Sequence, residues 1–476
     1  MARDTVATTP PLRTHVRVDL RQIAANFAAV QAACPPDFEL MGVVKANAYG
    51  HGAVPVSQTL ERAGCRAFGV ASMDEGGVLR EAGIAGEIFV LSGVLPSESC
   101  AAAELGLTPM LCSREAYAAW RDAALALGRP LPCHLHVETG MNRLGLHPGE
   151  AAAIASEIAQ DPTLTLEGVC THLASAEDFE DTQTPRQMET FSALLADLEQ
   201  RGIRPKRRHV ANSGGLAWRG LAGATMARPG LAIYGYLSAP VGGAPPARFE
   251  VRPALEWRAA VLAVKEVPPR ANASATTAPS PPNAPCGPPS SAWATATATA
   301  ASSGCGRVWL AGGHRPILGR ISMDLTAVDI TDAPPVQPGD EAIVLGAQVP
   351  AAELAALCNT IPYEILTGIA ARAPRIYSNS LKRGASRQAC RVASHRDRKR
   401  PQRSGNAVCC SYRSTGPHNF FSLYSRYVAG SASGFGVGIC APTLRRQAAS
   451  LAASSRVLSG MALAKSRVSP MSSRRS

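Results

Sequence analysis

The chain has 476 residues, enough for a large barrel and a second, smaller domain, and its formal net charge is +12. The positive charge is concentrated after residue 377, where 18 Lys and Arg stand against one acid, Asp397; residues 1–377 hold 30 basic and 35 acidic residues. The 13 cysteines form no CxxC pair, which argues against a zinc site, and their odd number indicates free thiols in a reducing cytoplasm. The N-terminus lacks the apolar core of a signal peptide, and no run approaches the roughly 18 apolar residues of a membrane span. We therefore expect a cytoplasmic chain with no membrane partner.

Residues 38–236 alternate between short apolar runs and stretches of helical periodicity. In the helical stretches, for example 114–128 and 186–202, apolar residues recur at steps of three and four. Eight strands, each followed by a helix, fit a (β/α)8 barrel better than an open doubly wound sheet, which is the alternative. The strand candidates are ELMGVV (39–44), AFGVA (67–71), IFVLSG (88–93), TPMLC (108–112), CHLHVE (133–138), LEGVCTHL (166–173), RRHVAN (207–212) and GLAIYG (230–235).

The chain after the predicted barrel has a different pattern. Residues 251–267 and 307–347 contain short β-rich runs bounded by Gly, Pro and Asp, which predict a smaller β-domain. Residues 351–377 show helical periodicity and end that domain. We accordingly expect an α/β barrel over 12–242, a β-rich domain over 243–377 that the strand near 16–20 can join, and a disordered basic tail over 378–476.

A lysine, Lys45, ends the first apolar run of the predicted barrel, in GVVKANAYGHG (42–52). The carboxyl ends of barrel strands line the active site, and a lysine there loses hydration, so its neutral amine becomes accessible near pH 7. A neutral amine can form a Schiff base with an aldehyde cofactor and can act as a base. On position alone, the simpler interpretation is a strand-end lysine whose amine reaches solvent.

Several further motifs occur along the chain: HVETGMNRLG (136–145), THLASAED (171–178), HVANSGG (209–215), RPGLAIYG (228–235), GRISMD (319–324) and TIPYEILTGIAARAPRIY (360–377). Together with VVKANAYGHG, they resemble the alanine racemase family, in the family's order, over roughly 12–267 and 307–377. The resemblance implies an enzyme that depends on pyridoxal 5'-phosphate (PLP), with a (β/α)8 barrel followed by a β-rich domain.

The resemblance gives Lys45 and Arg228 central roles. Lys45 would carry PLP as a Schiff base and act as the base on the D-alanine side. Arg228 would face the pyridine nitrogen of PLP. Because a guanidinium keeps its proton, that nitrogen would stay unprotonated and the ring would be a weaker electron sink. Without its flanking motif, Arg228 would be interpreted as part of a surface ion pair.

The other implied roles concern the phosphate, the cofactor ring and the substrate. Glycine-turn amides and hydroxyl groups suit a phosphate, although Asn212-Ser213 alone would be an ordinary helix cap. The implied phosphate ligands are Ser213, the backbone at Gly230 and Leu231, Tyr49 and Tyr363. His172 would pack by the ring, and Arg143 would lie near the phenolic oxygen and bind substrate. Met323 and Asp324 would bind substrate from a second subunit, so the resemblance implies a homodimer that binds PLP and alanine, with no metal.

The chain departs from the family pattern at His136. Two residues before the acid of VETG, many members carry a lysine that is carbamylated and supports the arginine that Arg143 matches. Histidine cannot form that adduct. The resemblance therefore leaves open what supports Arg143 here.

Residues 271–305 fit no folded part of the family. They contain no charged residue and no Leu, Ile, Val, Met, Phe or Tyr, which is typical of a low-complexity linker and predicts no ordered element. The family has a GYGDGY-like motif there, whose first tyrosine is the base on the L-alanine side. Codons for GVGYGDGY in a GC-rich gene, read one nucleotide later, give AWATATAT, which is 292–299 here. We infer a shifted frame from about 269 to about 305, with Thr295, which has no phenol, at the tyrosine's place.

These observations predict an alanine racemase that works by two-base proton transfer through a PLP aldimine. It would supply D-alanine for cell-wall peptidoglycan and would be slow without the tyrosine. One alternative is a PLP-binding protein without racemase activity, which GRISMD and TIPYE argue against. Another is a basic nucleic-acid-binding protein, which depends only on the tail and lacks patterned basic helices or interleaved aromatics. We expect no nucleic-acid partner, and a second frame change or missed stop explains the tail.

Overall fold

The computed structural model describes residues 12–221, 223–266, 306–319, 321–322 and 324–378, together with the backbone of 290–294. Three predictions lie outside these residues: Met323, Thr295 and the disorder of the tail beyond Ser378. Within the described part of the chain, no helix is both long and apolar enough to cross a membrane.

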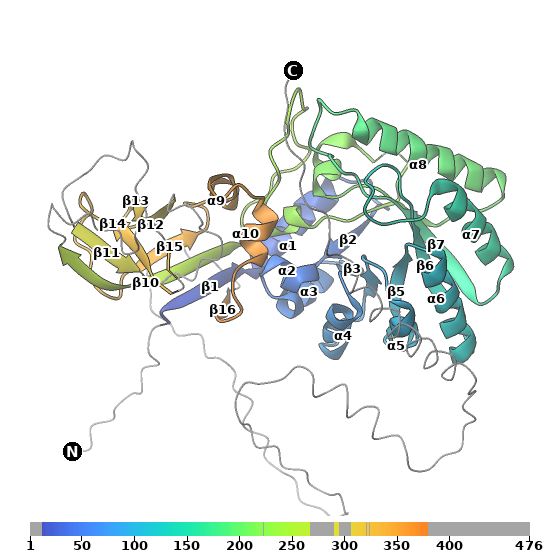
Figure 1. Cartoon of the computed structure of the whole chain (residues 1–476), viewed down its shortest axis with the longest axis horizontal. Helices are drawn as coiled ribbons and strands as arrows, with labels where there is room; N and C mark the ends of the chain where they lie inside the picture. Colours follow the sequence, from blue (N-terminus) through green and yellow to red (C-terminus); the bar gives the residue numbers. More distant parts are fainter. Residues whose placement is uncertain are drawn as a thin grey trace, which may run out of the picture. The chain divides into compact units, whose positions relative to one another are not determined.

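Eight parallel strands close into a barrel in the order β2-β3-β4-β5-β6-β7-β8-β9, and helices lie outside them (Figure 1). Closure comes from β2, which pairs with β9 through Glu39 and Met226. The predicted (β/α)8 barrel is thereby confirmed, and the open sheet is excluded. The strands are β2 (Glu39–Val43), β3 (Ala67–Val70), β4 (Glu87–Val90), β5 (Leu107–Leu111), β6 (Leu131–His136), β7 (Leu164–Cys170), β8 (Arg207–His209) and β9 (Met226–Ala227).

Two helices of the barrel begin at serine residues that cap them. Ser72 Oγ accepts a hydrogen bond from the Glu75 amide at the start of α4, and Ser113 Oγ accepts one from the Ala116 amide at the start of α6. The predicted helices at 114–128 and 186–202 correspond to α6 and α8. The helices are α1 (Leu20–Ala32), α2 (Lys45–Tyr49), α3 (Ala53–Arg62), α4 (Met73–Glu81), η1 (Pro96–Glu98), α5 (Ser99–Glu104), α6 (Arg114–Leu127), α7 (Pro148–Gln160), α8 (Gln183–Gln200) and η2 (Gly215–Arg219).

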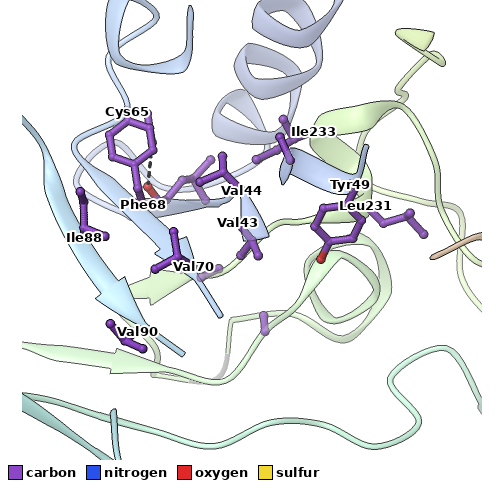
Figure 2. Packing of buried hydrophobic residues seen from close by; sticks show 14 of the residues in the cluster. Val43, Val44, Tyr49, Cys65, Phe68, Val70, Ile88, Val90, Leu231 and Ile233 are labelled. Carbon is purple, nitrogen blue, oxygen red and sulfur yellow. Dashed lines mark hydrogen bonds between the residues drawn. The ribbon is translucent and has the colours of Figure 1, made fainter. Parts of the chain in front are cut away.

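Barrel strands are buried on both faces, so they have continuous apolar runs rather than alternating ones. On β4, Ile88 and Val90 join the outer core between strands and helices, where Val70 and Tyr49 also lie (Figure 2). Phe89, between them, belongs to a separate cluster that fills the inside of the barrel. The same strand therefore supports two cores.

The predicted eighth strand, GLAIYG (230–235), was wrong. Residues Leu231–Tyr234 form a 3-10 helix, η3, and the eighth strand is the shorter β9 (Met226–Ala227). All four residues of η3 are buried, and a short apolar run buried on every side cannot be assigned to helix or strand by periodicity.

The second sheet has eight strands in the order β11-β14-β13-β12-β15-β10-β1-β16, which confirms the predicted β-rich domain. Its core includes Val261, Val308 and Val328. Two short helices, α9 (Ala351–Leu357) and α10 (Pro362–Thr367), follow β15. The strands are β1 (Thr14–Asp19), β10 (Leu255–Glu266), β11 (Ser290–Ala294), β12 (Arg307–Leu310), β13 (Gly313–Leu318), β14 (Thr326–Asp329), β15 (Glu341–Leu345) and β16 (Arg375–Ser378).

Two expectations for this sheet were wrong. Composition predicts no ordered element in 271–305, yet Ser290–Ala294 forms β11 between β10 and β14. Main-chain hydrogen bonds to a strand on each side do not depend on side-chain identity. A segment without charged or large aliphatic residues can therefore form a strand between β10 and β14. The helical pattern of 351–377 also ends early, because β16 pairs in parallel with β1.

At the end of the barrel where the strands begin, Arg207 binds three carboxylates from three strands. Its nitrogens lie 2.8 Å from Glu39, 2.6 Å from Glu87 and 3.0 Å from Glu167. Arg207 is 8% exposed, whereas each carboxylate is at least 33% exposed. Burial opposes its charge, but the hydrogen bonds and charges of Glu87 and Glu39 prevail and raise the pKa of Arg207. One cation therefore ties β2, β4 and β7 to β8.

We expect Arg207→Met to lower the free energy of unfolding by about 2–4 kcal/mol, because three clustered carboxylates lose their shared partner. Urea unfolding at pH 7 measures the loss. The deficit should shrink near pH 4, where the carboxylates become protonated. Arg114→Met is the matched control, because Arg114 pairs with Glu157 and Glu150 at an exposed position. Equal losses in the two variants would show that the Arg207 cluster contributes no more to the free energy of unfolding than an exposed ion pair does.

Candidate active site

Lys45 follows β2 directly, and the residues after it form a left-handed turn. The φ angles are 52° at Ala46, 53° at Asn47, 53° at Ala48 and 51° at Tyr49, and none of these residues is glycine. Each L-residue in this conformation costs about 1–2 kcal/mol, so the surrounding structure must hold it in place. We call residues 45–50 the lysine turn.

The lysine turn is held by Glu75, which lies on α4, and by Asn47, which belongs to the turn. The Glu75 carboxylate, on α4, accepts the Ala46 amide at 2.7 Å and the Ala71 amide at 2.8 Å, which joins the turn to the end of β3. Asn47 Oδ1 accepts the Ala53 amide at 2.8 Å, and this contact starts α3. The turn is thus fixed by specific acceptors rather than by glycine freedom.

His51 closes the turn from its other side. Its Nδ1 lies 2.9 Å from the Tyr49 carbonyl, and a carbonyl can only accept, so Nδ1 carries the proton. Burial lowers the pKa of His51 to about 4, so the ring is neutral at neutral pH. Its Nε2 has no hydrogen-bond partner among the described residues.

A chain of polar side chains runs into the barrel from Arg228. One Arg228 nitrogen lies 2.6 Å from His209 Nδ1, and His209 Nε2 lies 2.8 Å from His134 Nδ1. Since arginine can only donate, His209 must accept at Nδ1 and donate from Nε2 to His134. Burial and the charge of Arg228 lower the pKa of His209, so the ring stays neutral and can accept. Arg228 also donates to the carbonyls of Thr171 and Val210, which fixes its orientation.

Three cations act on one another at the lysine turn. Burial lowers the pKa of Lys45, the charges of Arg143 and Arg228 lower it further, and Glu75 opposes them. The predicted strand-end lysine therefore has an environment that favours its neutral amine. The same two arginines lower the pKa of His172, after burial, and His172 Nδ1 lies 3.3 Å from Arg228.

Hydroxyl groups and backbone amides gather beside the turn. Tyr49 stacks on Tyr234 with ring centroids 4.7 Å apart, and the Tyr363 ring lies 5.7 Å from Tyr49. Ser213 Oγ accepts the amides of Gly230 and Ala232, both at 3.1 Å, at the start of η3. A Cβ on Gly230 would lie 2.5 Å from the Tyr49 hydroxyl, so only glycine permits this approach. The structure thus brings Tyr49, Ser213, Gly230 and, next in the chain, Leu231 together.

His136 lies at the end of β6 with its Nδ1 3.8 Å from the Cys112 thiol. Burial and the charges of Arg228 and Arg143 lower the pKa of His136 to about 4. The ring is therefore neutral near pH 7 and supplies no negative charge to Arg143. Arg143 itself donates its backbone amide to Glu138 at 3.3 Å and has an exposed side chain.

Asp324 is not joined to this group. It accepts a hydrogen bond from Arg372 at 2.6 Å, and no contact within the described ranges links it to the lysine turn. Across the same ranges, no three His, Cys, Asp or Glu side chains could hold a metal ion together.

Sequence reasoning missed Glu75, His209 and His134. Glu75 lies in the first turn of a capped helix, where an acid needs no further explanation. His209 and His134 lie on barrel strands, where a lone histidine is more often structural. Only the closure of the barrel brings these strands near Arg228.

Two family models match the chain: the N-terminal domain of alanine racemase over residues 18–238 and the C-terminal domain over 288–377. Alanine racemase of Symbiobacterium thermophilum is 38% identical over 374 residues, which cover 76% of this chain and 97% of that protein. The chain belongs to the alanine racemase family. The prediction of this family, and with it of a PLP-dependent amino-acid racemase, is confirmed.

Solved structures agree with this family assignment. Alanine racemase from D-cycloserine-producing Streptomyces lavendulae is 32% identical with a TM-score of 0.69, over 79% of this chain and 99% of that one. Alanine racemase of Bacillus anthracis with bound L-Ala-P is 31% identical with a TM-score of 0.67, over 79% of this chain and 98% of that one.

The pKa of Lys45 should respond to its neighbours with opposite signs. Arg228→Leu removes a cation, so the pKa rises and the amine becomes reactive only at higher pH; Glu75→Gln removes an anion, so the pKa falls. Acetic anhydride labelling of the cofactor-free protein across a pH series, followed by peptide mass spectrometry, gives the midpoint for Lys45. The exposed Lys206 is the internal reference. Midpoints that move in the same direction in both variants would contradict this electrostatic account.

Proposed function

We propose that this chain holds PLP at Lys45 and interconverts L-alanine and D-alanine. The observation that carries the proposal is the lysine turn: a lysine with a lowered pKa at the carboxyl end of β2, beside Arg143 and Arg228. Membership of the alanine racemase family supports alanine as the substrate.

The residues at the site fit PLP by their chemistry. The hydroxyls of Tyr49 and Ser213 and the glycine turn at Gly230 are a donor set for a phosphate. The Lys45 amine is the group that can bind the aldehyde. Arg228 offers the pyridine nitrogen a donor that does not give up its proton, and His172 lies beside Arg228. No carboxylate among the described residues contacts the Arg228 side chain.

When bound, PLP supplies an electron sink for the pair of electrons left at the alanine Cα. Lys45 would hold the aldehyde of PLP and, as a free amine, would move the Cα proton on the D-alanine side. Arg228 stays protonated and, through the polar chain to His209, keeps its orientation. Arg143 places a positive charge near the substrate carboxylate. His136 adds no negative charge to oppose it.

The proton on the L-alanine side needs a second base. By resemblance this is a tyrosine, and the chain has Thr295 at the inferred place. A threonine hydroxyl has neither the reach nor the acidity of a phenol. We therefore propose that the chain as written inverts alanine slowly, and that an intact gene product supplies D-alanine for peptidoglycan.

Further parts of the proposal concern assembly and location. Met323 and Asp324 match residues that a second subunit contributes, so we propose a homodimer; the separation of Asp324 from the lysine turn within one chain accords with this. We also propose a cytoplasmic location without nucleic-acid or membrane partners. The alternative PLP-binding protein without racemase activity has a similar barrel but no β-domain, and the second sheet argues against it.

Borohydride should fix PLP to Lys45 alone. The purified protein should absorb in the visible region, and reduction should leave the cofactor on the peptide that contains Lys45, because this lysine has the environment of a neutral amine. Lys45→Ala should abolish the labelled peptide, while Lys206→Ala should leave it unchanged. Labelling of a different lysine would refute the assignment.

The chain as written should racemise alanine about 10²–10⁴-fold more slowly than a repaired chain that reads GVGYGDGY over the shifted stretch, because one general base is missing. Lys45 can still exchange the proton on its own face. In D2O, the chain should therefore exchange the Cα proton of D-alanine much faster than that of L-alanine. Circular dichroism and proton NMR follow the two rates. Equal racemisation by the two chains would refute the role given to the missing tyrosine.

A further inference from the structure

Arg375, on β16, makes hydrogen bonds only to backbone carbonyls within the described residues. Its Nε donates to Gly50 at 3.1 Å, at the end of the lysine turn. Its two terminal nitrogens donate to Ala370 and Ala373, both at 2.8 Å, and to Ile369 at 2.9 Å. Within the described ranges, no carboxylate forms a hydrogen bond or ion pair with the Arg375 guanidinium.

Those four carbonyls belong to two segments that each carry a tyrosine of the proposed phosphate site. Gly50 follows Tyr49 directly, and 369–373 is the loop that leaves α10, the helix of Tyr363. The fit between the segments is close: a Cβ on Gly50 would lie 2.4 Å from the Leu366 carbonyl of α10. Gly50 has φ 78°, so its conformation also favours glycine.

We propose that Arg375 is a positioning residue that sets the Tyr49 and Tyr363 hydroxyls for the cofactor's phosphate. A guanidinium has five N–H groups in a fixed plane, so one side chain can hold the lysine turn and the α10 loop in one relative position. The two tyrosine rings lie 5.7 Å apart and are tilted by 47°, an arrangement that depends on this position. The inference rests on the proposed function, because it assigns the phosphate to these tyrosines.

The consequence concerns the phosphate and not the aldehyde. Pyridoxal, which lacks the phosphate, can still react with Lys45 but cannot use Tyr49 and Tyr363 as ligands. Loss of Arg375 should therefore weaken PLP binding and leave pyridoxal binding unchanged. A residue that only stabilises the fold would change both affinities alike.

The matched control is Arg80, which also donates to four carbonyls. Its partners are Leu105 at 3.1 Å, Ile84 at 2.8 Å, Gly86 at 2.7 Å and Gly106 at 2.9 Å. Gly86 and Gly106 immediately precede β4 and β5, so these bonds lie at the opposite end of the barrel from Lys45. Arg80→Met thus removes the same number of bonds without touching the lysine turn.

The experiment titrates PLP and pyridoxal into the cofactor-free full chain, its Arg375→Met and Arg375→Lys variants, and Arg80→Met. We expect Arg375→Met to weaken PLP binding about ten- to hundredfold, the size of a lost charge-assisted contact, with pyridoxal unchanged. Arg375→Lys should fall between, because an ammonium keeps some donors. Arg80→Met should have the same ratio of PLP affinity to pyridoxal affinity as the unaltered chain.

Hydrogen exchange of the cofactor-free proteins provides a readout without PLP. Peptides that cover 46–52 should exchange faster in both Arg375 variants and not in Arg80→Met. If Arg375→Met does not fold, Arg375→Lys decides by the same two readouts. An unchanged ratio in the Arg375 variants, or an equal loss in Arg80→Met, would overturn the positioning role. If the unaltered chain binds neither compound at Lys45, the proposed function fails instead, and the exchange data alone decide whether Arg375 holds the turn.

Discussion

The left-handed lysine turn is the constraint on which the rest of the site depends. Four consecutive L-residues adopt a conformation that costs free energy at each one, so the turn exists only because its surroundings specify it. Glu75 holds its start, and His51 and Arg375 hold its end. The contacts come from α4, from the residue that follows the turn and from the last strand of the second sheet. The position of Lys45 is therefore a property of the whole fold rather than of its own motif.

The inside of the barrel serves the same lysine. Apolar residues such as Phe89 and Met110 fill one cluster there, but Arg228, His209 and His134 place a line of polar groups among them. Burial keeps both histidines neutral. His209 can therefore accept a hydrogen bond from Arg228 and donate one to His134. Because burial and neighbouring charges lower the pKa of Lys45, a fixed Arg228 is also a fixed contribution to its reactivity. The hydrogen bonds that fix Arg228 therefore also fix its effect on the pKa of Lys45.

The fold was largely predictable from sequence because the barrel strands are continuous apolar runs separated by helical periodicity. For the candidate site, sequence motifs pointed to Lys45, Tyr49, Ser213 and Arg228, which lie together in the structure, and their roles stay predictions. GLAIYG was assigned to a strand because a short, fully buried run has no periodicity that distinguishes it from η3. Arg375 and Glu75 were missed because their partners are backbone groups, including Gly50 for Arg375 and Ala46 for Glu75, and no pattern in the sequence records such contacts.

The histidine at position 136 shows how a departure from the family pattern can be judged by environment. A carbamylated lysine would bring a negative charge next to Arg143, whereas His136 is held neutral by burial and by Arg228 and Arg143 themselves. The charges that would attract an anion there instead prevent the histidine from becoming a cation. The site therefore retains the full positive charge of two arginines beside Lys45. Such a field favours the neutral Lys45 amine and an anionic ligand together.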